Sequence, residues 1–466
     1  MSWNKHEIDA LVNKQKKFYE TGQTHALQFR ISQLQILKQA IIKYEKQLSE
    51  ALYIDLGKSE AESYTTEIGI VLSSLTHTIK HLKKWMKPKR VATPLMMVST
   101  SGKIVSEPYG VTLIIAPFNY PMQLVFEPLL GAICAGNCAV IKPSEFTPHV
   151  SAVVERLIAE TFDSAFVAVV QGEQEETTWL LQNAFDFIFF TGSTRVGSIV
   201  MEAAAKQLIP VALELGGKSP SIVHRTANIE VAAKRIMWGK YINNGQTCIA
   251  PDYILIDEAI KDQFIKACQS ALNAFYGENI EQSEDYSRIV NERHFNRLVS
   301  MIEHDKEQLI FGGSHKQETR YIEPTFISGG SVHNPLPVKA MVDEVFGPIL
   351  TIMTFKDDQD VIPFVRKYNK PLALYVFSED SRFTNHIIEQ LPFGGGCIND
   401  TLSHFIHREL PFGGVGPSGL GSYHGKHSFD LFSHKKSVLT RSSKLETGLL
   451  FPPYKNKINI FKKFLK

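Results

Sequence analysis

Apolar segments of strand length alternate with helical stretches between Gly110 and about His224, and this alternation constrains the fold more than any other feature. The segments contain few polar breaks, so they favour strands that are buried on both faces. Strands of that kind, separated by helices, are typical of a parallel sheet with helices on both sides. We therefore predict a doubly wound α/β fold, which places ligands at the carboxyl ends of the strands. The expected strands are 111–116, 138–143, 166–170 and 185–190, and the expected helices are 126–135, 147–160 and 194–207.

The length of the chain predicts more than one domain. At 466 residues it exceeds what one hydrophobic core supports, since cores stop growing near roughly 250–300 residues. Apolar residues at helical spacing indicate helices over the first 90 residues, and a second α/β region runs from about residue 216 to 400. Between the helices and the first sheet we expect a β hairpin at 96–106, with its turn at Ser101-Gly102.

Composition argues against several classes of function. The net charge is +2, and no cluster of Lys and Arg lines one helix upstream of the tail, so nothing indicates nucleic-acid binding. The five cysteines form no CxxC pair, which favours a reducing compartment over a disulfide framework. The polar N-terminus lacks the apolar core of a signal peptide, and the apolar stretches are shorter than the roughly 20 residues of a membrane helix. We expect a cytoplasmic protein.

Two short segments point to covalent chemistry on a carbonyl group. Glu214 ends an apolar run just before Gly216-Gly217, and Cys248 follows the polar turn 244–247. A thiol can attack a carbonyl carbon, and a carboxylate can then activate the water that hydrolyses the acyl-thioester. An ordinary thiol has a pKa near about 8.5, so Cys248 needs activation by Glu214, a helix dipole or a bound cofactor. Most free cysteines are structural, a role that better suits the other four, Cys134, Cys138, Cys268 and Cys397.

A dinucleotide site is normally sought as G-x-G-x-x-G, and the literal match here is 414–419. We reject it, because no strand precedes it and Pro417 removes a backbone donor, so we expect a mobile glycine-rich loop. The stronger candidate is 189–197, where an apolar strand turns through Gly192 into a helix that Ser193 can cap. An ordinary capped connection between strand and helix is the alternative.

A second strand end favours the nucleotide interpretation. Lys142 and Glu145 follow the apolar run 138–141, where a parallel sheet would present an adenosine ribose. A carboxylate at that place accepts bonds from ribose hydroxyls and repels a 2′-phosphate. The pattern therefore favours NAD over NADP.

Asn119 lies between Pro117 and Pro121 at another expected strand end. A held amide can donate to an oxyanion, and losing such a donor typically costs about 10²–10³ in turnover. The alternative is an ordinary turn residue.

No metal site is expected, because the two i, i+3 histidine pairs lack an accompanying set of cysteine or carboxylate ligands; these pairs are His404/His407 and His424/His427.

Taken together, these motifs resemble the aldehyde dehydrogenase superfamily over nearly the whole chain. Five segments occur in family order, at 141–144, 190–193, 213–220, 244–248 and 344–348. The short N-terminus, and Phe-Pro-Pro-Tyr at 451–454 before a basic tail, look like the class 3 branch, whose members are commonly dimers. Phe118 departs from the tryptophan of many relatives, which leaves the size of the substrate open.

The resemblance implies a role for each matching residue. Cys248 would be the nucleophile and Glu214 the base, while Asn119 and the backbone N–H of Cys248 would bind the oxyanion. The implied cofactor-binding residues are Lys142 and Glu145 at the adenosine ribose, Gly192, Ser193 and Gly197 at the pyrophosphate, Glu344 at the nicotinamide ribose with Phe346 beside it, and Leu215.

The resemblance also implies a division of the chain. Residues 1–86 and 107–213 would form the NAD-binding domain, and 214–405 the catalytic α/β domain. A small β bridging element would comprise 87–106 and 428–450, followed by the basic C-terminal tail 451–466.

We predict NAD(P)-dependent oxidation of an aldehyde to a carboxylic acid, on medium- to long-chain aliphatic, aromatic or lipid-derived aldehydes. NAD is the expected coenzyme and NADP the alternative.

Three other functions stay open. A coenzyme A-acylating dehydrogenase would use the same thiol without a carboxylate base. A cofactor-independent thiol hydrolase would want a histidine partner, and none adjoins Cys248. The chain could also be a non-catalytic structural relative.

The amphipathic basic tail favours either weak peripheral contact with an anionic membrane or packing against the partner of a homodimer.

Overall fold

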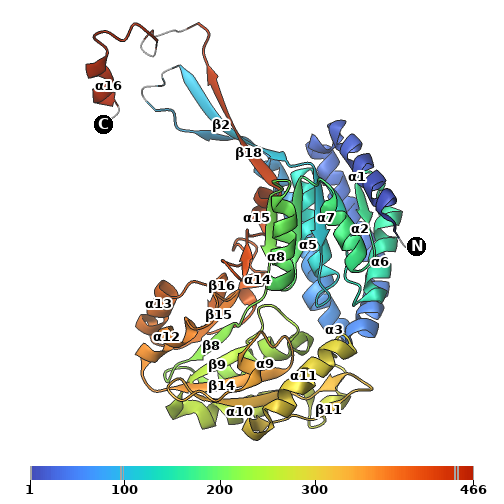
Figure 1. The fold of residues 1–466 in the computed structure, drawn as a ribbon, viewed down its shortest axis with the longest axis vertical. Helices are drawn as coiled ribbons and strands as arrows, with labels where there is room; N and C mark the ends of the chain where they lie inside the picture. The colour runs from blue at the N-terminus through green and yellow to red at the C-terminus, as the bar shows by residue number, and fades with distance from the viewer. Residues whose placement is uncertain (1–2, 95–96, 98, 445–447, 449–450, 465–466) are drawn as a thin grey trace.

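The computed structural model describes residues 3–94, 97, 99–444, 448 and 451–464. Two large, mostly parallel sheets form separate halves of the body, and a narrow three-stranded sheet projects from it (Figure 1). The predicted doubly wound α/β class is confirmed. Several residues of the expected elements lie outside the described residues: Met96 and Val98 in the hairpin, Leu95, 445–447 and 449–450 in the bridging element, and 465–466 in the tail.

The first sheet has the strand order β17-β7-β6-β3-β4-β5, and only β17 runs antiparallel to its neighbour. The order reverses between β3 and β6, which makes the carboxyl ends of these two strands the expected ligand site. The strands are β3 (Val111–Ile115), β4 (Cys138–Lys142), β5 (Val167–Val169), β6 (Phe187–Thr191), β7 (Val211–Glu214) and β17 (Gly419–Leu420).

Helices cover this sheet. The connecting helices α5 and α6 both contact the long helix α2, whereas α7 contacts α8 and α1. The buried, near-continuous apolar strands predicted from the sequence explain this double cover. The helices are α1 (Lys5–Glu20), α2 (Leu27–Leu56), α3 (Glu60–Ser63), α4 (Gly69–Trp85), α5 (Gln123–Ala135), α6 (Pro148–Thr161), α7 (Gln174–Gln182) and α8 (Thr194–Ala205).

The second sheet has the order β10-β13-β14-β9-β8-β15-β16 and is parallel except for β10. Its strands are β8 (Pro220–Val223), β9 (Tyr253–Asp257), β10 (Leu309–Phe311), β13 (Thr325–Ser331), β14 (Ile349–Phe355), β15 (Ala373–Phe377) and β16 (Gly395–Ile398). Its helices are α9 (Ile229–Tyr241), α10 (Lys261–Tyr276), α11 (Glu292–His304), α12 (Val361–Val365) and α13 (Ser381–Gln390), and a small ladder joins β11 (His315–Lys316) to β12 (Tyr321–Ile322).

The third sheet, which we call the arm, consists of β1 (Lys89–Val91), β2 (Thr100–Pro108) and β18 (Ser433–Arg441). The predicted turn at Ser101-Gly102 is wrong. Both residues lie inside β2, because that strand pairs with β1 on one side and with β18 on the other. The short helices α14 (Ser403–Ile406) and α15 (Gly425–Leu431) precede β18, and α16 (Ile458–Phe464) ends the described chain beside the arm (Figure 1).

The division into domains remains a prediction. The strands of the first sheet lie within or at the end of the range expected for the NAD-binding domain, with one exception. β17 comes from residues 419–420, which the expected division left unassigned, and it completes the first sheet against β7. Across the described part of the chain, no helix combines the length and the apolar character that crossing a membrane requires.

Candidate active site

The loop that carries Cys248 is held in an unusual backbone conformation by amide side chains. Asn243 and Asn244 have φ values of 52° and 56°, a left-handed region that asparagine tolerates better than most residues. The Asn244 amide donates to the carbonyl of Ser287 at 2.7 Å. The Gln246 side chain donates to the carbonyl of Arg288 at 3.0 Å and accepts from the backbone N–H of Val290 at 2.9 Å. Cys248 therefore sits at the end of a rigid turn, partly exposed.

The loop that carries Asn119 follows β3 and is tied directly to the Cys248 loop. The carbonyl of Asn119 accepts a hydrogen bond from the Asn243 amide at 2.7 Å. The Tyr120 hydroxyl lies 2.7 Å from the hydroxyl of Thr247, the residue before Cys248. These bonds involve the Asn119 carbonyl and the Tyr120 hydroxyl. The side-chain amide of Asn119 takes part in neither of them.

Glu214 is the last residue of β7 and lies beside the carboxyl end of β6. Its carbonyl accepts from the N–H of Gly192 at 3.0 Å, and Gly419 of β17 pairs with it on the other side. The carboxyl group is buried, and neither of its oxygens has a hydrogen-bond partner within the described chain. Burial raises the pKa of Glu214 well above its usual range. A buried carboxyl with a raised pKa is suited to take a proton near neutral pH.

The thiol of Cys248 is held in its neutral form. Burial raises its pKa most, and the carboxyl groups of Glu344 and Glu214 raise it further. Both carboxyl groups are therefore near enough to the thiol to affect its protonation. The prediction that this thiol needs activation agrees with its surroundings, since no cation is among the groups that shift its pKa.

The residues expected at the coenzyme lie at neighbouring strand ends. Lys142 at the end of β4 donates to the Glu145 carboxylate at 2.6 Å. Gly192 follows β6, and the Ser193 hydroxyl caps α8 by accepting from Val196 N–H at 3.4 Å.

Gly197 and Leu215 pack against each other behind that helix end. A Cβ on Gly197 would lie 2.6 Å from Leu215 Cδ2, so a side chain at this position would force Leu215 to move. The position of the Leu215 side chain therefore depends on this glycine.

Glu344 reaches the same region from the second sheet. Its carboxyl group lies against Gly216, where a Cβ would collide with it, and it bonds with the Gly217 N–H. Burial, followed by the nearby Asp252, raises the pKa of Glu344 to about 8. The buried pair of Lys218 and Asp252 supports this segment, because Lys218 also donates to the carbonyl of Asp343 at 2.9 Å.

Phe346 belongs to an aromatic cluster that sequence reasoning missed. Phe346 has φ 48°, and its ring packs edge-on against Phe118, with centroids 5.7 Å apart. Phe118 also contacts Phe146 and His294, at 5.8 and 4.9 Å. The departure at Phe118 thus lies between two segments expected at the coenzyme, 142–146 and 344–346. No local pattern marked His294, which joins the cluster from the first turn of α11.

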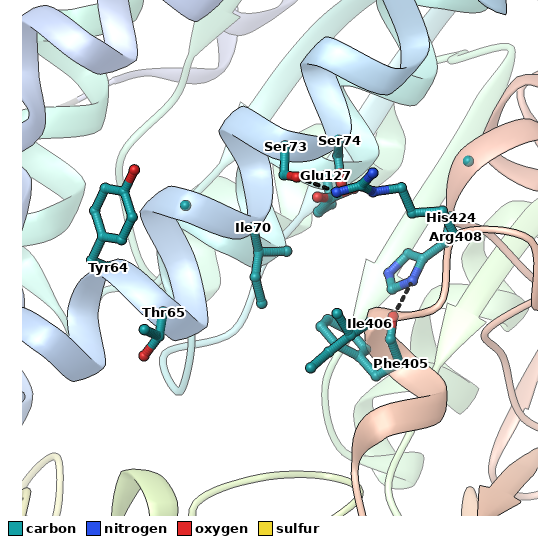
Figure 2. A pocket seen from close by; sticks show the side chains of 12 residues that line it. Tyr64, Thr65, Ile70, Ser73, Ser74, Glu127, Phe405, Ile406, Arg408 and His424 are labelled. Atoms are coloured by element: carbon teal, nitrogen blue, oxygen red, sulfur yellow. Dashed lines mark hydrogen bonds between the residues drawn. The ribbon is translucent and has the colours of Figure 1, made fainter.

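A cavity of about 280 Å³ opens beside α4 and α5 (Figure 2). Its apolar walls include Ile70 and Ile406, and the buried carboxyl of Glu127 lines it (Figure 2). Glu127 lies seven residues beyond Tyr120, and the N–H of Leu124 bonds to the Tyr120 carbonyl, so the helical turn begins there. The segment 120–127 therefore runs from the Tyr120 contact with Thr247 to the Glu127 side of the cavity.

The rejected glycine-rich motif 414–419 lies at the edge of the first sheet beside β7, and not between a strand and the helix that follows it. It runs into β17, and the carbonyl of Ser418 accepts from the N–H of Leu215 at 3.1 Å, next to Glu214. Among the described residues, no group of three or more His, Cys, Asp or Glu side chains could hold a metal ion. All five cysteines are free.

The donor set fits a nicotinamide dinucleotide. A capped helix end after β6 offers backbone N–H groups to phosphate, and carboxyl groups at residues 145 and 344 offer acceptors to ribose hydroxyls. Gly216 brings the backbone close to the Glu344 carboxyl, where no side chain would fit, and both Glu214 oxygens lack a hydrogen-bond partner within the described chain.

The fold and this constellation define an NAD(P)-dependent oxidoreductase with a cysteine and a glutamate in one site. Residues 2–438 match the model of the aldehyde dehydrogenase family, and the chain belongs to that family. The protein is therefore an aldehyde dehydrogenase that uses a nicotinamide coenzyme.

Three relatives illustrate the match. The chain is 52% identical to 4,4'-diaponeurosporen-aldehyde dehydrogenase of Staphylococcus aureus, over 97% of each chain. It is 44% identical to the dimeric NADP-preferring aldehyde dehydrogenase of Rattus norvegicus, over 93% of this chain and 95% of the relative. It superimposes on the solved substrate-bound state of Staphylococcus aureus AldH with a TM-score of 0.96 at 52% identity, over 98% of this chain and 99% of the other.

Proposed function

We propose that Cys248 is the nucleophile of this aldehyde dehydrogenase, that Asn119 and the Cys248 N–H bind the oxyanion, and that Glu214 is the base. The thiolate attacks the aldehyde carbon, forming a carbon–sulfur bond and an oxyanion at the former carbonyl oxygen. A bound nicotinamide coenzyme supplies the chemistry of hydride acceptance. Glu214 then takes a proton from water, which attacks the thioester, breaks the carbon–sulfur bond and releases the carboxylic acid.

The observation that carries this proposal is the pair of bonds joining the two loops. They tie the loop that carries Asn119 to the loop that carries Cys248, and neither oxygen of Glu214 has a hydrogen-bond partner within the described chain, which supports the three roles. A coenzyme A-acylating enzyme would need no such base.

The experiment follows NADH formation with hexanal in wild type, Cys248→Ala and Glu214→Gln. Cys248→Ala should abolish turnover. Glu214→Gln should give a burst of NADH followed by slow turnover, because hydrolysis of the thioester is impaired before hydride transfer. Full turnover in Cys248→Ala would overturn the nucleophile, and unchanged kinetics in Glu214→Gln would overturn the base.

We further propose that NAD is preferred and NADP is accepted more weakly. The 2.6 Å pair of Lys142 and Glu145 supports this preference, since Glu145 repels a 2′-phosphate that Lys142 alone would attract. The rat relative is named NADP-preferring. We therefore expect the choice between NAD and NADP to depend on the relative effects of Lys142 and Glu145 on a 2′-phosphate. Glu145→Gln should move the ratio of kcat/KM toward NADP.

We propose that long, apolar aldehydes enter through the cavity beside α5. Its apolar lining residues, which include Ile70 and Ile406, support this route, as does the short segment 120–127 that joins Glu127 of the cavity to the Tyr120 contact with Thr247. The Staphylococcus aureus relative is named for a carotenoid aldehyde, a long apolar molecule. A series of aldehydes of increasing chain length should show kcat/KM rising with length, and a Ile70→Lys variant should lose that rise.

We propose a homodimer in which β18 of one protomer extends the second sheet of the other at β16. Within the described chain, β18 pairs only with β2 and β16 only with β15, so each strand has an open edge. Open edges favour pairing with another chain, and Ile398 of β16 is 47% exposed. The rat relative is named dimeric.

We propose weak peripheral membrane contact through the arm and tail of a cytoplasmic protein. Free thiols favour a reducing compartment. Although the whole chain carries +2, the described arm and tail are strongly basic, with Glu107 as their one described acidic residue. Exposed apolar side chains lie among the basic ones, including Leu439, Tyr454 and Ile458. Vesicles with anionic lipid should co-sediment full-length protein more than a chain ending at 450.

A further inference from the structure

We propose that Lys58 and Glu67 are positioning residues, which hold the Asn119 loop at the distance from Cys248 that oxyanion binding requires. The inference rests on the oxyanion role proposed above for Asn119. Neither residue touches the reacting atoms, and neither belongs to a motif of the sequence. Both act through the backbone of the loop that follows β3.

Lys58 lies completely buried between α2 and α3 in the sequence, and its ammonium group contacts both Glu67 and the loop that carries Asn119. Its ammonium group donates to the carbonyl of Asn119 at 3.1 Å and to Glu67 Oε1 at 2.6 Å. It also lies 4.1 Å from the centroid of the Tyr120 ring, within the range of a cation–π interaction. The carbonyl of Asn119 thus accepts from Lys58 on one side and from Asn243 on the other.

Glu67 holds the far end of the same loop. Its Oε2 accepts the N–H groups of Met122 and Gln123, at 2.9 and 3.1 Å, where α5 begins. These first N–H groups of a helix have no partner within the helix, so the carboxylate caps α5. Glu67 lies in a π-helical turn, Tyr64–Ile68, a local widening often found at functional sites.

The neighbouring Glu62 extends the clamp to the nucleophile. Its Oε1 accepts the N–H of Asn243 at 2.7 Å, and Asn243 begins the left-handed turn that leads to Cys248. Burial raises the pKa of Glu62 to about 7, and the charge of Lys58 opposes that rise. One short segment, 58–67, therefore contacts both loops, with the charge of Lys58 between two carboxyl groups.

Stability alone does not account for this arrangement. A buried ion pair pays a desolvation penalty that its attraction often only balances, and apolar replacements of such pairs are frequently neutral for folding. Apart from the bond between Lys58 and Glu67 themselves, the side-chain hydrogen bonds of this pair described by the structure all go to the segment 119–123. The pair is directed at the geometry of that segment.

A double-mutant cycle between Lys58→Met and Asn119→Ala tests the inference. Asn119→Ala should lower kcat by about 10²–10³, the usual effect of losing one oxyanion donor. Lys58→Met should lower kcat about tenfold or more in the wild type, but less than about twofold in the Asn119→Ala background, because its effect passes through the lost amide. Lys58→Arg should recover part of the activity.

The cycle separates this inference from the proposed function. A full Lys58→Met effect in the Asn119→Ala background would overturn the positioning role while leaving the oxyanion role of Asn119 intact. If Asn119→Ala itself left kcat unchanged, both would be overturned. Alkylation of Cys248 by iodoacetamide needs no oxyanion site, so its rate should stay within about twofold in Lys58→Met, and a large fall would indicate general damage to the site and overturn the inference.

The matched control is Lys43→Met, which removes a lysine of α2 from an exposed pair with Glu160 and should leave kcat unchanged. If Lys58→Met does not fold, Glu67→Gln replaces it in the cycle. Glutamine keeps an oxygen for the two N–H groups and removes the charge that fixes Lys58, so the same dependence on Asn119 is expected.

Discussion

The hydroxyls of Tyr120 and Thr247 lie 2.7 Å apart and join two loops that are 127 residues apart in the sequence. One loop carries the Asn119 amide and the other the Cys248 thiol. We expect Tyr120→Phe to lower kcat by about two- to tenfold, since one hydrogen bond contributes about 0.5–1.5 kcal/mol. Thr247→Val should act similarly, and the double variant should lose little more than either single one. Strictly additive losses would argue against a shared contact.

The protonation of Cys248 can be followed through its reactivity. Burial and two nearby carboxyl groups raise its pKa, so the thiolate fraction should increase about tenfold per pH unit throughout the neutral and mildly alkaline range. In the protein without coenzyme, the rate of alkylation by iodoacetamide should therefore climb through pH 9 without a plateau. A plateau below pH 8 would contradict the raised pKa.

Glu344 should contribute to that behaviour in a pH-dependent way. Its pKa is about 8, so its negative charge opposes thiolate formation mainly above that pH. Glu344→Gln should thus speed alkylation of Cys248, and the ratio to wild type should grow between pH 7 and 9. A ratio that is constant across this range would show that the two groups do not interact.

The packing of Gly197 on Leu215 predicts a selective loss of coenzyme binding. A methyl group at residue 197 would lie 2.6 Å from Leu215 Cδ2, so Gly197→Ala should displace the side chain of Leu215, a residue expected at the coenzyme. Overpacking of this kind typically costs about 1–3 kcal/mol. We expect a weaker Kd for NAD by fluorescence titration, with a smaller change in iodoacetamide reactivity. Ser198→Ala, on the exposed side of the same helix turn, is the control and should bind NAD normally.

Charge on the open edge of β16 should prevent association of protomers. Ile398→Lys places an ammonium group on that edge, where pairing with another strand would bury it. Light scattering after size exclusion should show a monomer for this variant and a dimer for wild type. Ile388→Lys, an exposed site on α13, is the control and should leave the mass unchanged. A dimer in both variants would exclude this edge as the interface.

The fold was predictable because its strands are uniformly apolar, as in 111–115 and 187–191, and their helices have clear periodicity. Glu214 and Cys248 were identifiable because each is an isolated reactive group bordered by glycine or small polar residues. Their roles remain predictions, although the structure brings them into one site with Glu344.

Contacts between distant segments escaped prediction. Lys58 and Glu67 lie in a stretch that reads as ordinary helix, and their partners in the Asn119 loop are 55 to 61 residues away, so no local pattern records them. The turn expected at Ser101-Gly102 failed for a related reason. Small residues often mark a turn, but pairing with strands on both sides keeps this segment extended.

β17 gives the protein a late step in its assembly. Residues 419–420 close the outer edge of β7 at Glu214, although β7 itself is completed some two hundred residues earlier in the chain. A nascent polypeptide leaving the ribosome therefore carries an uncovered strand edge until residues 419–420 have been synthesised. Prematurely terminated chains would expose that edge to other molecules, which makes truncation products of this protein candidates for aggregation.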